Sequence, residues 1–341
     1  MDVELLKRDV LAYAESIGID KVGFAATDVF TELKNRLIER EGLGYNSGFE
    51  KGTVEERTEP TRLMPGAKSI ISIALAYPSR IMDPPKSKAG ERRGIFCRAS
   101  WGEDYHHVLR ERLDKLAAYL SERVADLQYK IMVDTGELSD RAVAERAGIG
   151  FIGKNTLLIT EEYGSFVYLG EMITNIPFTP DEKSTLSCGD CRICMDACPT
   201  GALVKPGQLN AQNCLAFQTQ TKTPLPDKFR AKIGTRIYGC DTCQSVCPYN
   251  KGVDFHLHDE FEPDGEVAKP LLEPMLHMSN REFREKFGHV SGFWRGKNPL
   301  QRNAMIALGH FKDETAVESL IKTLTTDVRP MIRGTAAWTL G

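Results

Sequence analysis

The 341-residue sequence has no hydrophobic run long enough to cross a membrane. Its longest mostly apolar run, Ile70 to Tyr77, is far shorter than the roughly 18 residues that a membrane-spanning helix needs. The N-terminus mixes charged residues into its apolar pattern, so it lacks the apolar centre of a signal peptide. We therefore expect a cytoplasmic protein that makes no membrane contact, and nothing in the sequence suggests more than a monomer.

A strong excess of charge is also absent. The chain holds 44 Lys and Arg against 47 Asp and Glu, a net charge of −3 at pH 7. Nucleic-acid binding would therefore have to come from a local basic patch. Hydrophobic residues make up 41% of the chain, which is ordinary for a globular protein and excludes global disorder. Because the length is about twice the roughly 150 residues of a typical domain, two or three domains are expected.

Residues 1–178 alternate between helical and β-strand patterns. Apolar spacing predicts a helix from Val3 that ends at Gly18, another over His106–Val124, and a third from Ser139 to Gly148. Strands are expected near residues 21–25, 69–77, 129–133, 156–160 and 165–172. This alternation predicts an α/β (or α+β) N-terminal domain, which we expect to bind a cofactor.

Eight of the nine cysteines lie between Cys188 and Cys247, and only Cys97 stands apart. A reducing cytoplasm disfavours disulfides, so this cluster indicates metal or redox chemistry. The first four of the eight precede Pro199 in the pattern C-x2-C-x2-C-x3-C-P: Cys188, Cys191, Cys194 and Cys198. In bacterial ferredoxins the fourth cysteine of this run binds the neighbouring cluster.

The second motif repeats the first incompletely, because Ile237 stands where its first cysteine would be. Cys214 is the one unassigned cysteine nearby and would supply the missing ligand. Crossing the fourth cysteines gives one [4Fe-4S] set of Cys188, Cys191, Cys194 and Cys247, and a second of Cys198, Cys214, Cys240 and Cys243. Two four-thiolate zinc sites are the alternative, although zinc does not need the third cysteine or the Cys-Pro ending. A bacterial ferredoxin-like two-cluster domain is therefore expected over residues 179–260.

Residues 261–341 are expected to form a basic segment followed by α-helical HEAT-like repeats. Residues 252–273 hold seven acids and one lysine, whereas 278–302 hold six Lys and Arg against two acids. From Asn298 the chain is self-similar, because Leu300 and Ala304 recur 32 residues later as Ile332 and Ala336. Since the sequence stops inside the second copy, we expect a C-terminal truncation.

Two further features are candidates for a functional site. Gly148, Gly150 and Gly153 match a nucleotide-binding pattern, but a helix precedes them and a strand follows, the reverse of such loops. The glycine loop therefore more plausibly approaches another cofactor. Asp134 directly follows a predicted strand, where α/β domains place catalytic groups. Taken alone, an aspartate there is more often a turn residue, and Cys97 more often a small buried side chain.

Together these motifs resemble the epoxyqueuosine reductase family over essentially the whole chain. The resemblance rests on Asp134-Thr135-Gly136, the run from 147 to 156, Leu169-Gly170-Glu171, both Cys-Pro motifs and the C-terminal helices. It implies reduction of epoxyqueuosine to queuosine at the tRNA wobble position. It also implies base-off cobalamin, reduced through the two clusters by an unidentified low-potential electron donor.

The resemblance implies roles for particular residues. Asp134 matches the proposed proton donor of the family, for which it would need a raised pKa. Cobalamin is expected between the N-terminal and cluster domains, in contact with Arg57, Cys97, Asp134 and Asp241. A histidine lower ligand is not indicated, because Asp259 stands where the D-x-H-x-x-G corrinoid motif needs glycine.

The resemblance also favours a tRNA surface on the basic segment, comprising Arg281, Arg284, Arg295, Lys297, Asn298 and Arg302. A solvated helical face over an aromatic core is the alternative there. Two rival functions also stay open. A cobalamin-dependent reductive dehalogenase would usually carry a twin-arginine signal, which is absent. An electron-transfer ferredoxin fused to a helical scaffold would leave the first 178 residues unexplained.

Overall fold

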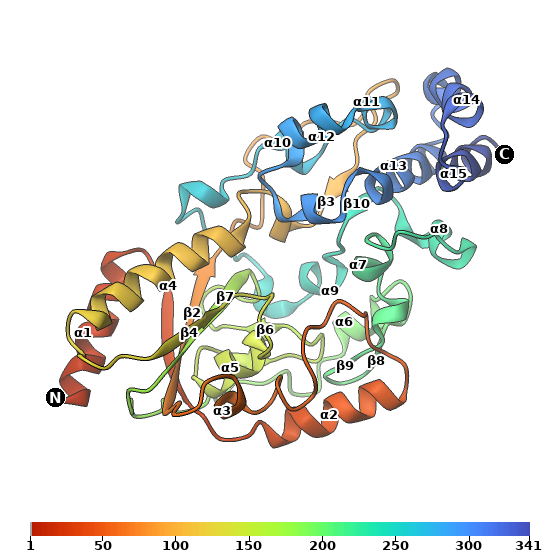
Figure 1. Cartoon of the computed structure of the whole chain (residues 1–341). Helices are drawn as coiled ribbons and strands as arrows, with labels where there is room; N and C mark the ends of the chain where they lie inside the picture. The colour runs from red at the N-terminus through yellow and green to blue at the C-terminus, as the bar shows by residue number, and fades with distance from the viewer. Residues whose placement is uncertain (1) are drawn as a thin grey trace.

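A four-stranded antiparallel sheet forms the centre of the N-terminal half (Figure 1). The computed structural model describes residues 2–341. The strand order is β1 (Lys21–Ala26), β2 (Ser69–Ala76), β7 (Val167–Thr174) and β4 (Tyr129–Met132). Every neighbouring pair is antiparallel, so this half is the α+β form of the predicted class.

Helices cover both faces of this sheet. On one face α1 (Val3–Ser16) and α4 (Tyr105–Ser121) pack onto a core that contains Tyr168 and Met172 of β7. On the other face α5 (Asp140–Arg146) packs with Val167, Leu169 and Ile173 of the same strand. The alternation of β7 between two cores follows from the two-residue period of a strand. The predicted helices and the four long strands are confirmed to within a few residues.

Shorter elements connect these layers. They are α2 (Thr31–Gly42), α3 (Pro60–Leu63), β3 (Ile95–Phe96), β5 (Phe151–Ile152) and β6 (Leu158–Ile159). β5 and β6 form a hairpin outside the main sheet, with Thr156 at a φ of 68° between them. The strand predicted at 156–160 is thus shortened to β6, and α2 was not predicted.

The cysteine-rich region contains short elements around its loops. These are α6 (Ile193–Asp196), β8 (Leu203–Lys205), β9 (Gln208–Leu209), α7 (Leu215–Gln218), α8 (Asp227–Ile233), β10 (Arg236–Tyr238) and α9 (Thr242–Ser245). β10 pairs in parallel with β3, which buries Ile237 completely. The residue that stands in place of the first cysteine of the second motif is thus part of the hydrophobic core.

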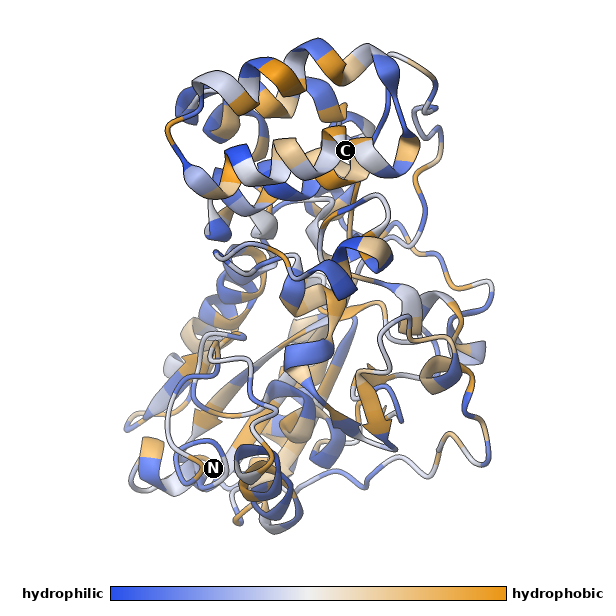
Figure 2. Cartoon of the chain, turned by 90° about the vertical axis from the view of Figure 1, so that its right-hand side faces the viewer, coloured by the Kyte–Doolittle hydropathy of each residue, from blue (hydrophilic) through white to orange (hydrophobic). Residues whose placement is uncertain are grey.

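The C-terminal region is helical and has an amphipathic colouring in Figure 2. Its helices are α10 (Gly265–Ala268), α11 (Leu272–His277), α12 (Asn280–Phe287), α13 (Lys297–Phe311), α14 (Val317–Thr326) and α15 (Pro330–Leu340). Short 3-10 helices occur along the whole chain, three of them in this region. They are Arg98–Ser100, Ala211–Asn213, Pro248–Asn250, Asp259–Phe261, Ser291–Arg295 and Glu314–Ala316. Leu300, Ala304, Ile332 and Ala336 share one core, so the repeated positions are the buried ones.

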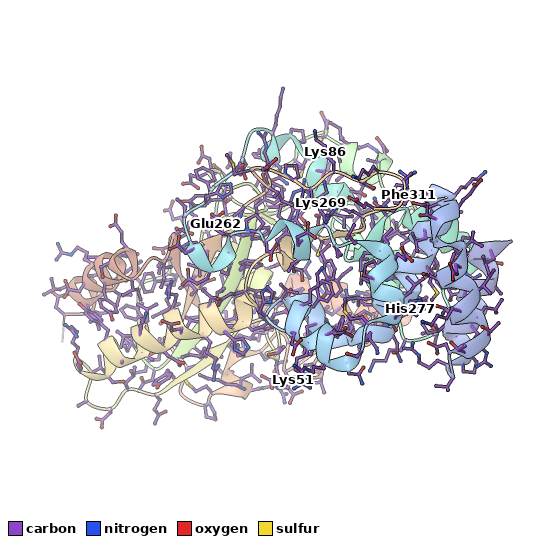
Figure 3. The ribbon with its side chains drawn as sticks, turned by 90° about the horizontal axis from the view of Figure 1, so that it is seen from above. Lys51, Lys86, Glu262, Lys269, His277 and Phe311 are labelled. Atoms are coloured by element: carbon purple, nitrogen blue, oxygen red, sulfur yellow. The ribbon has the colours of Figure 1, made fainter. Side chains whose placement is uncertain are left out.

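The N-terminal half also contributes to the C-terminal core. Phe96 and Trp101 pack in the same hydrophobic cluster as the C-terminal helices. Arg92 pairs with Asp313 at 3.0 Å, and its guanidinium lies 4.9 Å from the ring centre of Phe311, a residue labelled in Figure 3. Within residues 2–341, no helix combines the length and apolar character needed to cross a bilayer.

Candidate active site

The structure brings the eight clustered thiols together in two groups of four. Burial raises the pKa of the Cys194 thiol, which is raised further by three neighbouring thiols, those of Cys188, Cys247 and Cys191. Cys247 belongs to the second motif, so the last cysteine of that motif is near cysteines of the first motif, as the predicted first ligand set requires. Which thiols bind which cluster stays a prediction.

The second group is centred on Cys214 and Cys240. Burial raises the pKa of Cys214, and the thiols of Cys240 and Cys198 raise it further. The pKa of Cys243 is also raised, by burial first and then by Cys240 and Cys214. Cys194 of the first group acts on Cys243 as well, so the two groups adjoin there.

Backbone amides point at the thiols of both groups. The N–H of Ala202 donates to Cys198 Sγ at 3.3 Å, and that of Lys154 to Cys188 Sγ at 3.4 Å. Such N–H donors stabilise thiolates that bind iron-sulfur clusters. Across residues 2–341, no three His, Cys, Asp or Glu side chains converge closely enough to hold a single metal ion.

Asp134 lies at the end of β4 in a left-handed backbone conformation. Its φ is 49°, which is uncommon for a residue other than glycine. The Asp134 N–H donates to Asp140 Oδ2 at 2.7 Å, and this bond ties the turn to the first residue of α5. The Asp134 side chain is 63% exposed, so its carboxylate is accessible to a bound molecule.

His106 connects Asp134 to a second carboxylate. Its Nδ1 lies 2.6 Å from Asp104 Oδ1, and its Nε2 lies 3.4 Å from Asp134 Oδ2. Burial lowers the pKa of His106, but the two carboxylates outweigh burial and raise it to about 9. The imidazole is therefore protonated at neutral pH.

The same contact corrects the expected acidity of Asp134. The interaction with His106 lowers the pKa of Asp134, and burial opposes this effect without overcoming it. We expected a raised pKa for a proton donor. With the pKa of His106 raised to about 9 and that of Asp134 lowered, the proton of this pair belongs on His106 at neutral pH and the carboxylate is ionised.

Aromatic side chains line the space beside Asp134. The rings of Tyr105 and Tyr168 are stacked with centroids 4.6 Å apart. Burial raises the pKa of Tyr238, and the charges of Cys97 and Asp134 raise it further. Tyr238 is therefore near both residues, and the predicted contacts Cys97 and Asp134 lie around one site.

Cys97 and Asp241 lie beside the second thiol group. Asp241 Oδ2 accepts hydrogen bonds from the Arg98 N–H at 2.9 Å and from the Arg98 guanidinium at 3.1 Å. A Cβ on Gly239 would lie 2.3 Å from Cys97 Sγ, so only glycine permits this approach. Burial, Asp241 and Cys240 raise the pKa of Cys97 well above its usual range.

Arg57 has a less direct place in the site. Burial lowers its pKa, as do the charges of Arg40 and Arg141, whereas Glu50 raises it. Among these charged neighbours of Arg57, Arg141 also lowers the pKa of Asp134. The Arg141 guanidinium also donates to the Thr156 carbonyl, which brings the glycine loop close to the Asp134 turn.

One buried amide close to this site, Asn155 Nδ2 beside the glycine loop, has no hydrogen-bond acceptor within residues 2–341. Buried polar atoms are nearly always satisfied, so this amide suits a polar ligand with an amide oxygen. The residues present therefore fit an amide-bearing cofactor such as a corrinoid.

The basic segment is only partly exposed, and the tRNA contact expected at Arg302 is wrong. Arg302 is 0% exposed, and its guanidinium donates to the carbonyls of residues 218, 219, 221 and 223. A guanidinium buried in this way cannot reach phosphate. Arg281 and Arg284 of α12 are exposed, although Arg281 pairs with Glu285 at 2.7 Å.

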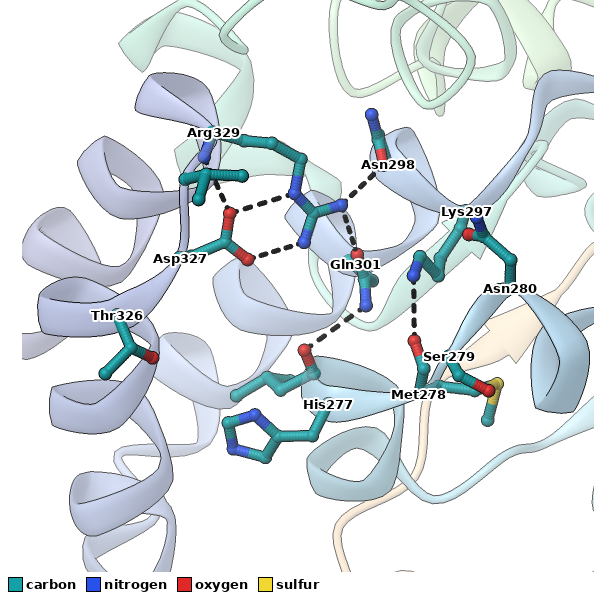
Figure 4. Close-up of a pocket in the computed structure, with 12 residues that line it drawn as sticks. His277, Met278, Ser279, Asn280, Lys297, Asn298, Gln301, Thr326, Asp327 and Arg329 are labelled. Atoms are coloured by element: carbon teal, nitrogen blue, oxygen red, sulfur yellow. Dashed lines mark hydrogen bonds and ion pairs between the residues drawn. The ribbon is translucent and has the colours of Figure 1, made fainter.

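Lys297 and Asn298 line a cavity between the end of α11, the start of α13 and the connection from α14 to α15 (Figure 4). Lys297 Nζ donates to the Met278 carbonyl at 2.9 Å, and Asn298 accepts from Arg329 at 2.5 Å. Arg329 also pairs with Asp327 at 2.6 Å. These cations are thus engaged within the protein.

Arg295 and its neighbour Trp294 belong to the basic segment that the sequence indicated, and the structure adds two aromatic rings that the sequence did not indicate, Phe49 and Phe217. We call this partly exposed group the Trp294 cluster: Phe49, Phe217, Trp294 and Arg295. The Phe49 ring lies 5.2 Å from that of Phe217 and 5.3 Å from that of Trp294. The Arg295 guanidinium covers the Trp294 ring at 4.5 Å. Trp294 is 54% exposed and donates to the Tyr238 hydroxyl at 3.0 Å, which joins this cluster to the site.

Family models match two parts of the chain. Residues 57–135 match the model described as "Epoxyqueuosine reductase QueG, DUF1730". Residues 187–250 match a 4Fe-4S double cluster binding domain, which contains all eight clustered cysteines.

Whole-chain relatives agree with these matches. An epoxyqueuosine reductase of Bacillus subtilis is 64% identical over 100% of this chain and 88% of its own length. A solved epoxyqueuosine reductase with an epoxyqueuosine-modified tRNA-Tyr stem loop has a TM-score of 0.97 and 64% identity, covering 99% of this chain and 90% of that one. The structure of the B. subtilis enzyme with its Asp134 catalytic loop swung out of the active site has a TM-score of 0.97 and 63% identity, and it covers 99% of this chain and 90% of that one. The chain therefore belongs to the epoxyqueuosine reductase family.

Proposed function

We propose that the protein reduces epoxyqueuosine to queuosine in tRNA. The observation that carries this proposal is the juxtaposition of an acid site, Asp134 with His106, and a thiol group suited to a redox cluster beside Cys97. Removal of the epoxide oxygen as water consumes two electrons and two protons and leaves an alkene. A protein that performs this reaction needs an electron supply and a proton source at one site.

The cofactors would be held by groups already described. The two sets of four thiolates would each hold a [4Fe-4S] cluster, which supplies single electrons. Base-off cobalamin, contacted by Cys97, Asp134, Asp241 and the rim residue Arg57, would supply a strongly reducing cobalt centre. The second thiol set adjoins Cys97 through Cys240, so it is the set nearer to this site.

The chain's own contribution to the chemistry is the proton. At rest, His106 holds it between Asp104 and Asp134. As negative charge develops on the leaving epoxide oxygen, a proton passed from His106 to Asp134 can be donated to that oxygen by the exposed carboxyl group. Asp104 keeps the imidazole oriented and favours its reprotonation.

The remaining parts of the proposal concern setting and partners. The C-terminal helices would act as a HEAT-like scaffold. The protein would work in the cytoplasm, where its tRNA substrate is found. It would work as a monomer. A low-potential electron donor would reduce the clusters. These assignments rest on the family, and on the fact that one chain supplies all the residues named for the site.

A single anaerobic experiment tests the function. Protein reconstituted with iron, sulfide and cobalamin is given a chemical reductant and an epoxyqueuosine-modified stem loop, and the nucleosides are analysed by mass spectrometry. Queuosine should form only when cobalamin is present. Corrinoid binding without queuosine formation, but with dehalogenation of an aryl halide, would favour the dehalogenase class. No corrinoid binding would favour a simple electron carrier.

The raised pKa of His106 predicts a basic limb in the pH profile. The wild-type single-turnover rate should fall as the pH rises through about 9, because His106 then loses its proton. In His106→Gln the remaining acid is Asp134, whose ordinary pKa is about 3.9, so the fall should occur at lower pH. Stopped-quench rates from pH 6 to 10 measure both profiles. A variant whose basic limb stays near 9 would contradict this role.

The same pKa shift predicts a pH-dependent stability. The folded-state pKa of His106 lies above its ordinary value of 6.5. Its contribution is therefore complete below pH 6.5 and is lost as the pH rises through about 9. The difference in free energy of unfolding between wild type and His106→Gln should shrink over this window in denaturant titrations.

We propose that the Trp294 cluster and the exposed arginines of α12 contact tRNA. Trp294→Ala should weaken stem-loop binding by about 1–3 kcal/mol, the usual value of one base-aromatic stack, without changing its salt dependence. Arg284→Gln should lower the slope of log K against log salt by about 1. Fluorescence anisotropy at several salt concentrations measures both quantities.

Trp294→Phe provides the matched control for this prediction. It keeps an aromatic ring but loses the hydrogen bond to Tyr238. If Trp294→Phe binds as weakly as Trp294→Ala, the hydrogen bond and not base stacking explains the loss. Unchanged binding in both Trp294→Ala and Arg284→Gln would refute the surface.

A further inference from the structure

Glu171 is a buried carboxylic acid group that the chemistry described above does not use. It lies in the middle of β7, opposite Ser72 of β2 and Met132 of β4. The alternation of β7 directs it to the face that α5 covers, together with Leu169 and Ile173. Glu171 is 0% exposed, although the sheet around it is almost entirely apolar.

Neither carboxyl oxygen of Glu171 has a hydrogen-bond donor within residues 2–341. The hydroxyl of Ser72, on the neighbouring strand, is likewise buried without a partner. Helix α5, which begins at Asp140, packs on this face of β7. The charged groups that act on Glu171 are the carboxyls of Asp140 and Asp134. An ionised carboxylate buried without a cation or a donor is strongly disfavoured.

A fully buried acid beside a second, partly buried acid favours sharing one proton between them, because a carboxylate can only accept hydrogen bonds. The position of Asp140 shows which of them is ionised. Asp140 is the first residue of α5, where the helix dipole favours a negative charge, and it accepts the Asp134 N–H at 2.7 Å. Arg141 also acts on Asp140 with a positive charge. Glu171 therefore carries the shared proton and can donate it in a hydrogen bond to Asp140.

We propose that Glu171 is a neutral acid that holds the Asp140 carboxylate in place as the anchor of the Asp134 turn, so that Glu171 and Asp140 are positioning residues for the reaction. The proposal rests on the catalytic role of Asp134 proposed above. The turn needs an anchor because the left-handed conformation of Asp134 is uncommon for a residue other than glycine. In the B. subtilis enzyme, the Asp134 catalytic loop has a state swung out of the active site.

The acidities of the two groups agree with this arrangement. Burial raises the pKa of Glu171 well above its usual range, and the charge of Asp140 raises it further. Burial and the charge of Asp134 raise the pKa of Asp140 to about 7, with opposition from Arg141 and two backbone N–H donors. Glu171 is the weaker acid of the two and keeps the proton.

The test compares two replacements of Glu171 in the reconstituted holoenzyme. Glu171→Gln keeps the shape and an N–H donor for Asp140, so turnover and stem-loop affinity should remain within about threefold of wild type. Glu171→Leu removes the donor from an apolar site of similar volume. The turnover rate of this variant should fall by about tenfold to 10²-fold, the effect of a reacting group displaced by about 1 Å, with unchanged stem-loop affinity.

Hydrogen exchange of the segment 133–136 reports the anchor without using activity. Exchange there should be faster in Glu171→Leu and unchanged in Glu171→Gln. Ser72→Ala is the matched control, since it changes the neighbouring buried hydroxyl and should alter neither exchange nor turnover. A folded Glu171→Leu protein with wild-type exchange and turnover would overturn the proposal.

Infrared spectroscopy detects the proton itself and decides the matter if Glu171→Leu does not fold. The difference spectrum between wild type and Glu171→Gln at pH 8 should contain the carbonyl band of a protonated carboxylic acid. Absence of this band overturns the proposal. If Asp134→Asn is fully active while the band and the exchange differences are present, the anchor stands and the catalytic role of Asp134 fails.

Discussion

Asp134→Asn is expected to lower the single-turnover rate by about 10²- to 10⁴-fold, the usual loss when general-acid help is removed. Asparagine keeps the size of the side chain and the backbone N–H that donates to Asp140, but it cannot accept the His106 proton and pass it on. Both clusters, cobalamin and the stem loop should still bind. The rate is measured by mass spectrometry with pre-reduced enzyme, which separates the chemical step from electron delivery.

Asp114→Asn is the matched control, because it makes the same chemical change at an exposed position on α4. It should leave the rate within about twofold of wild type. Near-normal conversion by pre-reduced Asp134→Asn would falsify the assignment. A loss of less than about tenfold would instead mean that His106 or Tyr105 protonates the oxygen directly.

The elements that the sequence predicted well are those with a strong apolar pattern. α1 and α4 each bury a regular stripe, and all eight residues of β2 are buried. α2 was missed because Leu37 is its one buried residue and charged residues dominate the rest. With so few apolar positions, most of the helix surface is polar, and its position depends on tertiary contacts that a pattern does not contain.

The double-cluster domain was predictable because the spacing of the cysteines constrains which thiolates can surround a cluster. His106 was interpreted as a helix-start residue, since its role depends on the approach of β4 to the first turn of α4. No local pattern encodes that approach, although Asp104 and His106 stand two residues apart. Arg302 was misassigned for the related reason that a count of charges does not show burial. Its acceptors come from residues about 80 positions earlier in the chain.

The pKa of Asp134 could not be predicted from the sequence either, because it depends on a partner that only the fold brings close. A catalytic acid at neutral pH suggests a raised pKa, and the sequence offered no partner to lower it. In the structure, protonated His106 lowers it and itself stores the proton. The proton source is thus a pair of residues, and a single position in the sequence could not reveal it.

Cys214→Ser is expected to lower the iron content from about eight to about four atoms per chain and to abolish multiple turnover. Cys214 completes the second thiol group, because Ile237 occupies the position of the missing cysteine and is buried in the core. The first group does not include Cys214, so its cluster should be retained. Iron analysis and electron paramagnetic resonance of the dithionite-reduced protein measure the loss.

Cys97→Ser is the matched control for this substitution, because Cys97 lies beside the second thiol group but belongs to neither ligand set. This variant should keep about eight irons per chain and unchanged cluster spectra, even if its affinity for cobalamin falls. Loss of a cluster in Cys97→Ser together with full iron in Cys214→Ser would show that Cys97 is the fourth ligand. Loss of both clusters in Cys214→Ser would mean that the two sites assemble together. The grouping of the thiols requires that Cys214→Ser loses the second cluster and keeps the first, and that Cys97→Ser keeps both. Each cluster would then depend on its own four cysteines.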